Sequence, residues 1–338
     1  MRSGNLLRLA LVALVSLAAG QAQAQCVAGA IGTARRVEID TTGGPRFGHN
    51  QYPGPELLAP GEIVLTFDDG PHKQLTPVIL DVLDQHCAKA TFFMVGQRAM
   101  GYSDLVHEVA RRGHTIGTHT WSHANLRQKG HDGAIAEIEL GISAVQKSLG
   151  GPAAPFFRFP YLSDPASAIA HLRSRSTAIF SIDVDSFDFR TRSPTVVIRN
   201  VTQQLKAKGR GIILFHDIQP STAGALGSLL ADLKSSGFRV VHLVPRKGQT
   251  TIADFDRRVG SPSRTVAALG LPVARRTMVA PAWEQRVEPL QQVAPAAAPQ
   301  IAAAAVQGVP TPEPRPAVVR PARERVSDDW RTTIFRGW

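Results

Sequence analysis

The chain has 338 residues and a formal net charge of +11, because 38 Lys and Arg residues outnumber 27 Asp and Glu residues. This length is enough for one large domain with further segments appended to it. The positive charge would suit an anionic cell-wall polymer or a membrane surface, whereas the lack of a nucleic-acid motif and of a basic helix with interleaved aromatic residues argues against nucleic acid.

Residues 1–24 have the features of an export signal. Arg2 gives a positively charged start, and the apolar stretch 9–19 that follows is too short to span a bilayer comfortably. The sequence AQA at 22–24 has the small-x-small pattern of a cleavage site, with an uncleaved anchor as the alternative. We therefore predict an exported protein, periplasmic or secreted, that begins near Gln25.

Residues 25–60 are rich in Gly and Pro and are predicted to form an irregular N-terminal arm. The arm holds Cys26, and the second cysteine of the sequence is Cys87. An even cysteine count in an exported protein favours one disulfide, which would tie the start of the mature chain to the helix after the first strand. Two unpaired thiols are the alternative.

From residue 61 to about 247, short apolar runs alternate with amphipathic segments. The predicted strands are 63–67, 90–95, 115–118, 156–159, 178–184, 211–215 and 239–243. The predicted helices are 76–86, 105–112, 133–149, 163–173, 194–208 and 222–236. Repeated strand–helix alternation predicts an α/β fold with a parallel sheet, either open or closed into a barrel.

Residues 248–338 form a predicted tail in which the alternation fades. Between 279 and 325 the chain is rich in Ala, Pro, Gln and Arg, a composition that cannot bury enough apolar surface to order itself. We expect a largely disordered Pro/Ala-rich C-terminal tail whose positive charge could contact the cell wall or a membrane surface. Its end, DDWRTTIFRGW, would be either a short docking element or unstructured.

Polar side chains stand at the ends of five predicted strands. In parallel α/β folds, functional groups gather at the carboxyl ends of strands. In chain order the residues singled out at these strand ends are Asp68 and Asp69, His119 and His123, Arg158 and Tyr161, Asp183, Asp185 and Asp188, and finally His216 and Asp217 with the apolar Leu214 before them. We therefore expect the functional site at this edge of the sheet.

The spacing of His119 and His123 is compatible with a metal site. Four residues apart on one helical turn, both imidazoles would face the same way, although a surface or capping pair is the alternative for this spacing alone. No Glu stands between them, so the zinc-protease pattern H-E-x-x-H is absent. Two histidines with one carboxylate of the Asp68-Asp69 pair would make a three-ligand catalytic site, and the cation would lower the cost of two adjacent negative charges.

The segments TFDDGPH, HTWSH, RFPY, DSFDF and LFHD, in this order, resemble the five motifs of the polysaccharide deacetylases, carbohydrate esterase family 4. The resemblance covers residues 61–244 and implies a catalytic domain at 61–247. It also implies a distorted (β/α) barrel of about seven parallel strands. Members of this family remove N-acetyl, sometimes O-acetyl, groups from chitin oligomers, peptidoglycan and related glycans. They use a divalent metal, usually zinc (Zn2+), and such a ligand set would also accept Co2+, Ni2+ or Mn2+.

The resemblance assigns the metal side of the site residue by residue. Asp69, His119 and His123 would hold the metal. Asp68 would be the general base that takes a proton from the attacking water. Arg158 would pair with Asp68 and keep it ionised, and a purely structural ion pair is the alternative.

The resemblance also assigns the leaving-group side. His216 would be the general acid that protonates the departing amine, and Asp188 would keep His216 charged. The backbone N–H of Tyr161 would stabilise the oxyanion, and Leu214 would line the pocket for the acetyl methyl group. The acid and the base would thus have opposite partners that separate their pKa values.

Two positions depart from the family pattern. Ala124 follows the second histidine where Pro is usual, and we expect the backbone to compensate. Phe189 ends the fourth motif where Trp is usual, which would weaken the packing around His216 but leave Asp188 in place. Trp121 could stack on a sugar ring, but packing is the preferred interpretation.

Two other functions use the same sequence features. A metal-dependent O-acetyl esterase acting on a glycan would need the same residues, and a non-catalytic glycan-binding envelope protein could retain the fold. Against the second, the base, the acid and all three ligands are present. Asp217 is expected to support the site or to cap the next helix, and Asp183 and Asp185 have no expected role.

Overall fold

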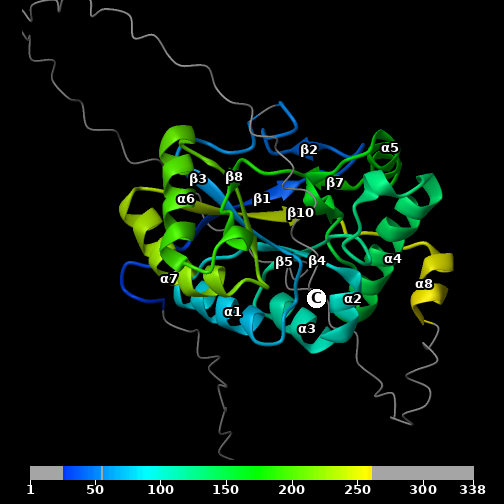
Figure 1. Cartoon of the computed structure of the whole chain (residues 1–338), viewed down its shortest axis with the longest axis horizontal. Helices are drawn as coiled ribbons and strands as arrows, with labels where there is room; N and C mark the ends of the chain where they lie inside the picture. Colours follow the sequence, from blue (N-terminus) through cyan, green and yellow to red (C-terminus); the bar gives the residue numbers. More distant parts are fainter. Residues whose placement is uncertain (1–25, 55, 261–338) are drawn as a thin grey trace, which may run out of the picture. The chain divides into compact units, whose positions relative to one another are not determined.

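The computed structural model describes residues 26–54 and 56–260. The predicted export signal and the predicted tail beyond residue 260 lie outside the described residues. Within these ranges, the strands lie in the middle and most of the helices lie around them (Figure 1). No helix of the described part is both long and apolar enough to cross a membrane.

The elements alternate along the chain. The strands are β1 (Thr33–Ile39), β2 (Arg46–Phe47), β3 (Glu62–Asp68), β4 (Thr91–Met94), β5 (Thr115–Thr118), β6 (Phe156–Phe157), β7 (Ala178–Phe180), β8 (Val184–Asp185), β9 (Gly211–His216) and β10 (Arg239–Pro245). The α-helices are α1 (Leu75–Gln85), α2 (Gly96–Gly101), α3 (Ser103–Arg111), α4 (His131–Leu149), α5 (Ala166–Ser174), α6 (Pro194–Lys208), α7 (Pro220–Ser235) and α8 (Ala253–Gly260). Short 3-10 helices are η1 (Leu126–Gln128), η2 (Pro160–Leu162) and η3 (Asp188–Arg190).

The strand pairings are parallel, and the sheet closes on itself. β3 pairs with β9 and with β4, and the order continues from β4 through β5, β6 and β7. Residues 181–183 separate β7 from β8, and β8 pairs with β9, which completes the ring. β10 pairs with the first two residues of β3, and β1 pairs with β10. The predicted distorted (β/α) barrel of parallel strands is therefore confirmed.

Aromatic and aliphatic side chains fill the space between the strands and the helices. Every residue of β3 is buried, and Phe67 stacks on Phe92 of β4 and on Phe215 of β9, with ring centroids 5.0 and 5.5 Å apart. Leu80 and Leu83 of α1 are fully buried. Burial of one such side chain contributes about 1.5–3 kcal/mol. This packing fixes the carboxyl ends of β3, β4 and β9 relative to one another.

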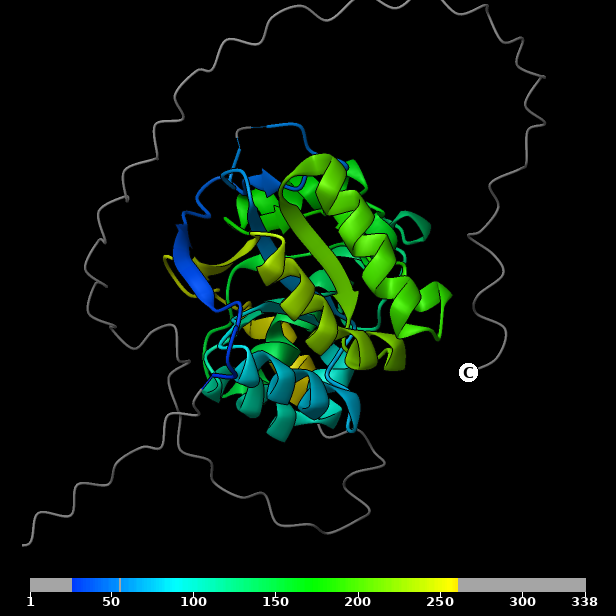
Figure 2. The ribbon, with the colours of Figure 1, turned by 90° about the vertical axis from the view of Figure 1, so that its left-hand side faces the viewer.

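The prediction that residues 25–60 form an irregular arm is wrong in part. It contains β1, which pairs with β10 (Figure 2), and β2, which pairs with β7. The charged residues Arg35, Arg36 and Glu38 are exposed on β1, so this edge strand lacks the apolar run on which the prediction depended. Helices α2 and α8 are also additional, and α8 begins after the predicted domain end at residue 247.

The predicted disulfide between Cys26 and Cys87 is confirmed, with the two Cα atoms 5.6 Å apart. It joins the segment before β1 to the turn between α1 and β4. Two backbone hydrogen bonds continue this contact, from Gly32 to the carbonyl of His86 and from Thr33 to the carbonyl of Cys87, each 3.0 Å long. The segment before β1 is thus attached to the turn between α1 and β4 by covalent and hydrogen bonds.

Candidate active site

The end of β3 directs two adjacent carboxylates to different partners. Asp68 is the last residue of β3 and is 3% exposed, whereas Asp69 has a φ of 76°, in the left-handed region. The next position requires glycine, because a Cβ on Gly70 would lie 2.0 Å from Asp217 Oδ2. In this turn Asp68 contacts Arg158, and Asp69 lies against the loop that follows β5.

Two histidines reach Asp69 from a loop. His119 and His123 follow β5, and both Thr120 (φ 64°) and His123 (φ 59°) have left-handed backbone conformations. The expected helical turn is therefore wrong, although the four-residue spacing still brings the two imidazole centroids within 5.0 Å. Gly141 of α4 permits this close approach of the loop, since a Cβ there would lie 2.6 Å from the carbonyl carbon of Thr120.

Asp69, His119 and His123 form a cluster with the donor atoms of a metal site. Asp69 Oδ1 lies 3.1 Å from His123 Nε2 and 3.4 Å from His119 Nε2. One ligand atom from each residue lies within 4.8 Å of the other two. Asp69 Oδ1 is buried and has no hydrogen-bond partner. A buried oxygen without a donor needs a cation or another compensating group, so the residues present fit a divalent ion.

The position of the proton on the His119 ring also favours binding of a cation. His119 Nδ1 lies 2.7 Å from the carbonyl oxygen of Arg158. Since a carbonyl only accepts, Nδ1 carries the proton, and the lone pair of Nε2 is left for a metal. One carboxylate and two imidazoles are a donor set that zinc accepts.

Arg158 is fully buried beside Asp68. Its Nη1 donates to Asp68 Oδ1 at 2.8 Å and to Thr66 Oγ1 at 2.7 Å, and its other nitrogens donate to two main-chain carbonyls. Burial lowers the pKa of Arg158, and the charge of Asp68 opposes this effect. The second oxygen of Asp68 lies 3.9 Å from His119 Nε2, so Asp68 stands between its arginine and the metal cluster.

His216 lies across from Asp68 at the ends of two adjacent strands, where the two residues are register partners. Its Nδ1 lies 2.7 Å from Oδ1 of the fully buried Asp188, which also accepts from the backbone N–H of His216 and from the hydroxyl of Thr222. Burial lowers the pKa of His216, but the charge and the hydrogen bond of Asp188, together with the charges of Asp69 and Asp68, outweigh burial and raise the pKa to about 10. The edge of the Phe189 ring packs against His216, with centroids 5.6 Å apart.

Tyr161 and Leu214 lie close to these groups. Tyr161 follows β6 in η2 with a φ of 58°, and its ring centroid is 4.7 Å from that of His123. Leu214 is buried in β9, two residues before His216, so both side chains lie on the same face of the strand. The predicted roles in oxyanion binding and in the methyl pocket stay predictions.

Asp217 and Trp121 hold neighbouring parts of the fold in place by hydrogen bonding and by packing. Thr76 Oγ1 donates to Asp217 Oδ2 at 2.6 Å, and burial raises the pKa of Asp217 to about 7. Its contact with Gly70 places Asp217 under the turn that carries Asp69, in agreement with the expected support of the site. Trp121 packs on α2, where a Cβ on Gly96 would lie 2.9 Å from the indole.

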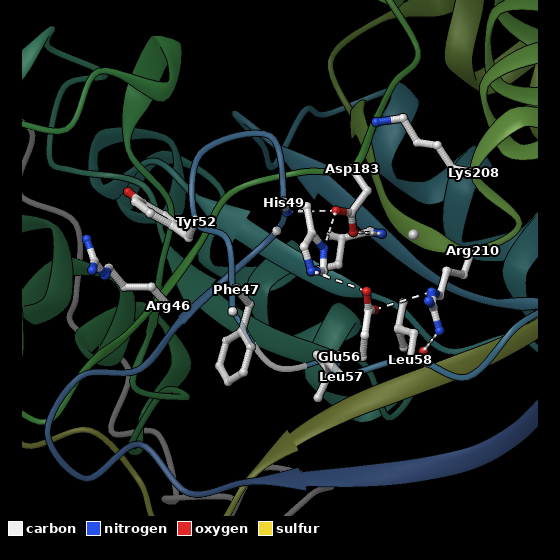
Figure 3. Close-up of a pocket in the computed structure, with 14 residues that line it drawn as sticks. Arg46, Phe47, His49, Tyr52, Glu56, Leu57, Leu58, Asp183, Lys208 and Arg210 are labelled. Carbon is white, nitrogen blue, oxygen red and sulfur yellow. Dashed lines mark hydrogen bonds and ion pairs between the residues drawn. The ribbon is translucent and has the colours of Figure 1, made fainter.

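Asp183 lies away from the metal cluster, in a cleft of about 220 Å³ where β8 and β9 begin (Figure 3). Asp183 Oδ1 accepts from the backbone N–H of His49 at 2.7 Å, and Oδ2 accepts from Ile212 at 2.7 Å. In the same cleft, Glu56 lies between His49 and Arg210, at 3.5 and 3.2 Å. The sequence had assigned Asp183 no role, and the structure assigns it to the attachment of the segment before β3.

Comparisons with known proteins identify the relatives of this chain. A sequence profile of the polysaccharide deacetylase family matches residues 58–176. A peptidoglycan-N-acetylglucosamine deacetylase of Bacillus cereus is 33% identical over 195 residues, which are 56% of this chain and 69% of the relative. A chitooligosaccharide deacetylase of Azorhizobium caulinodans is 33% identical over 168 residues, which are 48% of this chain and 77% of the relative.

A solved structure shows the same fold. The peptidoglycan deacetylase of Bdellovibrio bacteriovorus superposes with a TM-score of 0.58 at 34% sequence identity. The match covers 63% of this chain and 59% of the Bdellovibrio chain, so a substantial part of each lies outside it.

Proposed function

Because this chain belongs to the polysaccharide deacetylase family, we propose that it is a metal-dependent hydrolase that removes N-acetyl groups from an N-acetylglucosamine-containing glycan. Peptidoglycan and chitin oligomers are the two substrate classes that the named relatives suggest. The proposal includes export to the periplasm or the cell exterior, where such polymers occur, and the Cys26–Cys87 disulfide supports an oxidising compartment.

One observation carries the proposal: a carboxylate held by an arginine and an imidazole held by a carboxylate stand at the ends of two adjacent strands, next to a metal-type cluster. Asp68 and His216 are register partners on β3 and β9, and the Asp69 cluster begins one residue after Asp68. Amide hydrolysis needs a base for water and an acid for the amine. Arg158 contacts the base at 2.8 Å, and Asp188 contacts the acid at 2.7 Å and favours its protonated form.

In the proposed reaction, Asp69, His119 and His123 would hold a divalent cation, for which zinc is the first choice. The cation, when bound, would lower the pKa of water and polarise the acetamide carbonyl. Asp68 accepts a proton from the attacking water as the new C–O bond forms. The carbonyl carbon becomes tetrahedral, and its oxygen gains negative charge.

The remaining groups act on this tetrahedral species. The backbone N–H of Tyr161 donates to the oxyanion, which carries more charge than the ground-state carbonyl and so binds more tightly. His216 gives its proton to the nitrogen as the C–N bond breaks, because an unprotonated amine is a poor leaving group. Acetate and a free amino sugar result. Leu214, on the same face of β9 as His216, would contact the acetyl methyl group.

Acetate release by the mature protein, with zinc or cobalt added, tests the function. The substrates are chitin oligomers and peptidoglycan fragments, with acetylated xylan as the ester substrate. We expect Asp68→Asn to lower kcat by about 10²–10⁴, the usual contribution of a general base, while zinc still binds. Asp232→Asn, an exposed carboxylate on α7, is the control and should keep wild-type kcat.

The outcomes separate the candidate functions. Release from the N-acetylated glycans that disappears in Asp68→Asn supports the proposal. Release from acetylated xylan alone would show an O-acetyl esterase. No release from any substrate, with zinc shown to be bound, would contradict the enzyme and favour a glycan-binding protein.

A further inference from the structure

A glutamine outside the five motifs connects two parts of the candidate active site. Gln51 lies before β3, and its side-chain amide has a partner at each end. Its Nε2 donates to the carbonyl oxygen of Leu162 at 2.7 Å, and its Oε1 accepts from the hydroxyl of Ser181 at 2.7 Å. The acceptor at Leu162 fixes which end of the amide is the donor, since a carbonyl cannot donate.

Each partner of Gln51 is next to a residue with a proposed role in the reaction. Leu162 adjoins one in the sequence, and Ser181 is hydrogen-bonded to another. Leu162 directly follows Tyr161, and both have left-handed backbone conformations, with φ of 51° and 58°. Ser181 is fully buried, and its carbonyl oxygen accepts from Arg158 Nη2 at 3.1 Å. Gln51 therefore bridges the turn with the proposed oxyanion donor and the strand end that holds the partner of the base.

The segment that carries Gln51 is fixed on both sides. His49 is bonded to Asp183 on one side (Figure 3), and on the other side Tyr52 donates its hydroxyl hydrogen to Asp164 at 2.9 Å. Gly48 lies directly against the strand end, because a Cβ on it would lie 2.5 Å from the carbonyl carbon of Ser181. A side chain held in this way can restrain its partners, since its own position is already determined.

A left-handed turn of two non-glycine residues needs such a restraint. Backbone of this kind costs about 1–3 kcal/mol per residue and persists where the surroundings hold it. The turn has its own hydrogen bonds, from Leu162 to Phe159 and from Ser163 to Pro160, each 3.0 Å long. The bond from Gln51 is an additional contact from outside the turn.

We propose that Gln51 is a positioning residue for the deacetylation, which orders the turn at Tyr161 relative to Arg158. This inference rests on the proposed function for its kinetic part only. The Tyr161 N–H acts on charge that develops in the transition state, so its misplacement should lower kcat and kcat/KM equally and leave KM unchanged. The ordering of the turn is a property of the protein with or without substrate.

Three variants of the full mature protein test the proposal. Gln51→Ala removes both bonds, whereas Gln51→Glu keeps an acceptor for Ser181 but cannot donate to Leu162 when ionised. Gln249→Ala is the matched control, because Gln249, like Gln51, accepts from a hydroxyl, that of Thr177, at 3.1 Å, and it is the more buried of the two glutamines. Each variant is assayed for acetate release, for thermal stability and for amide hydrogen exchange at residues 162 and 163.

We expect both Gln51 variants to lower kcat about tenfold with KM within twofold, and to speed exchange at residues 162 and 163 about tenfold or more. Gln249→Ala should lower the Tm comparably and change neither kcat nor this exchange. Wild-type kcat in both Gln51 variants, or unchanged exchange in both, would overturn the positioning role. If wild-type protein releases no acetate, the proposed function fails, and the exchange measurement still decides whether Gln51 orders the turn.

Discussion

The pH dependence of the proposed reaction should be set on its alkaline side by Asp188. His216 must be protonated to act as the acid, so activity is lost as the pH rises through its pKa. Burial lowers that pKa, but the carboxylates around His216, Asp188 first among them, raise it to about 10 from an ordinary value of 6.5. Asp69 and Asp68 also raise the pKa of His216, but a bound cation would offset their negative charges. Asp188 then remains as the residue that sets the pH above which activity is lost.

Asp188→Asn keeps an oxygen for His216 but removes the negative charge. With the His216 pKa at its ordinary value of 6.5, about 3% of the imidazole would be protonated at pH 8, against most of it in the wild type, where Asp188 holds the pKa higher. At pH 5.5 both forms would be about 90% or more protonated. We therefore expect kcat/KM to fall by about 30-fold at pH 8 and by less than about threefold at pH 5.5.

The assay is acetate release from a chitin oligomer between pH 5 and 10, with zinc saturation checked at each pH. Thr222→Val is the control, because it removes a hydroxyl donor from Asp188 but leaves the carboxylate charge. Its alkaline limb should stay within about half a pH unit of the wild type. An equal loss in Asp188→Asn at pH 5.5 and at pH 8, or an unmoved alkaline limb, would refute the reasoning.

Three further changes have defined outcomes. Asp68→Asn should lower the free energy of unfolding by about 3 kcal/mol in urea denaturation, because the buried Arg158 loses the carboxylate that it contacts; an unchanged midpoint would contradict this. Asp69→Asn should weaken zinc binding more than about 100-fold in chelator competition, since loss of a ligand costs more than loss of a supporting residue, and wild-type affinity would reject the ligand set. The double change of Cys26 and Cys87 to Ser should cost about 4 kcal/mol, from a loop of 61 residues, and a Tm equal to that of the wild type would count against it.

The sequence predicted the central strands because these are short apolar runs between helices with clear periodicity. β3 and β9 are examples, and their boundaries agree with the prediction within one residue. β1 could not be predicted in the same way, since its exposed face is charged and its partner β10 is remote in the sequence. Pairing between distant segments leaves no local pattern in either of them.

The candidate site was predictable where the chemistry is local to a strand end. Asp68 and Asp69 were found in this way, whereas the geometry that separates them depends on a positive φ that the residue types do not reveal. The helical turn expected for His119 and His123 failed for the same reason, because two left-handed residues replace it. Gln51 carries no signal, since a single polar residue in a loop is ordinary until its partners are known.

The pairing of β1 with β10 has a consequence for the order in which the chain can fold. Residues near Arg36 pair with residues near His242, so within the described residues the first strand to be synthesised has no partner until the last strand has been made. Closure of so long a loop is slow, and an unpaired edge strand is prone to aggregate meanwhile. The link from Cys26 to Cys87 needs a much shorter stretch of chain. It can therefore hold β1 beside its final position while the rest of the barrel is still incomplete.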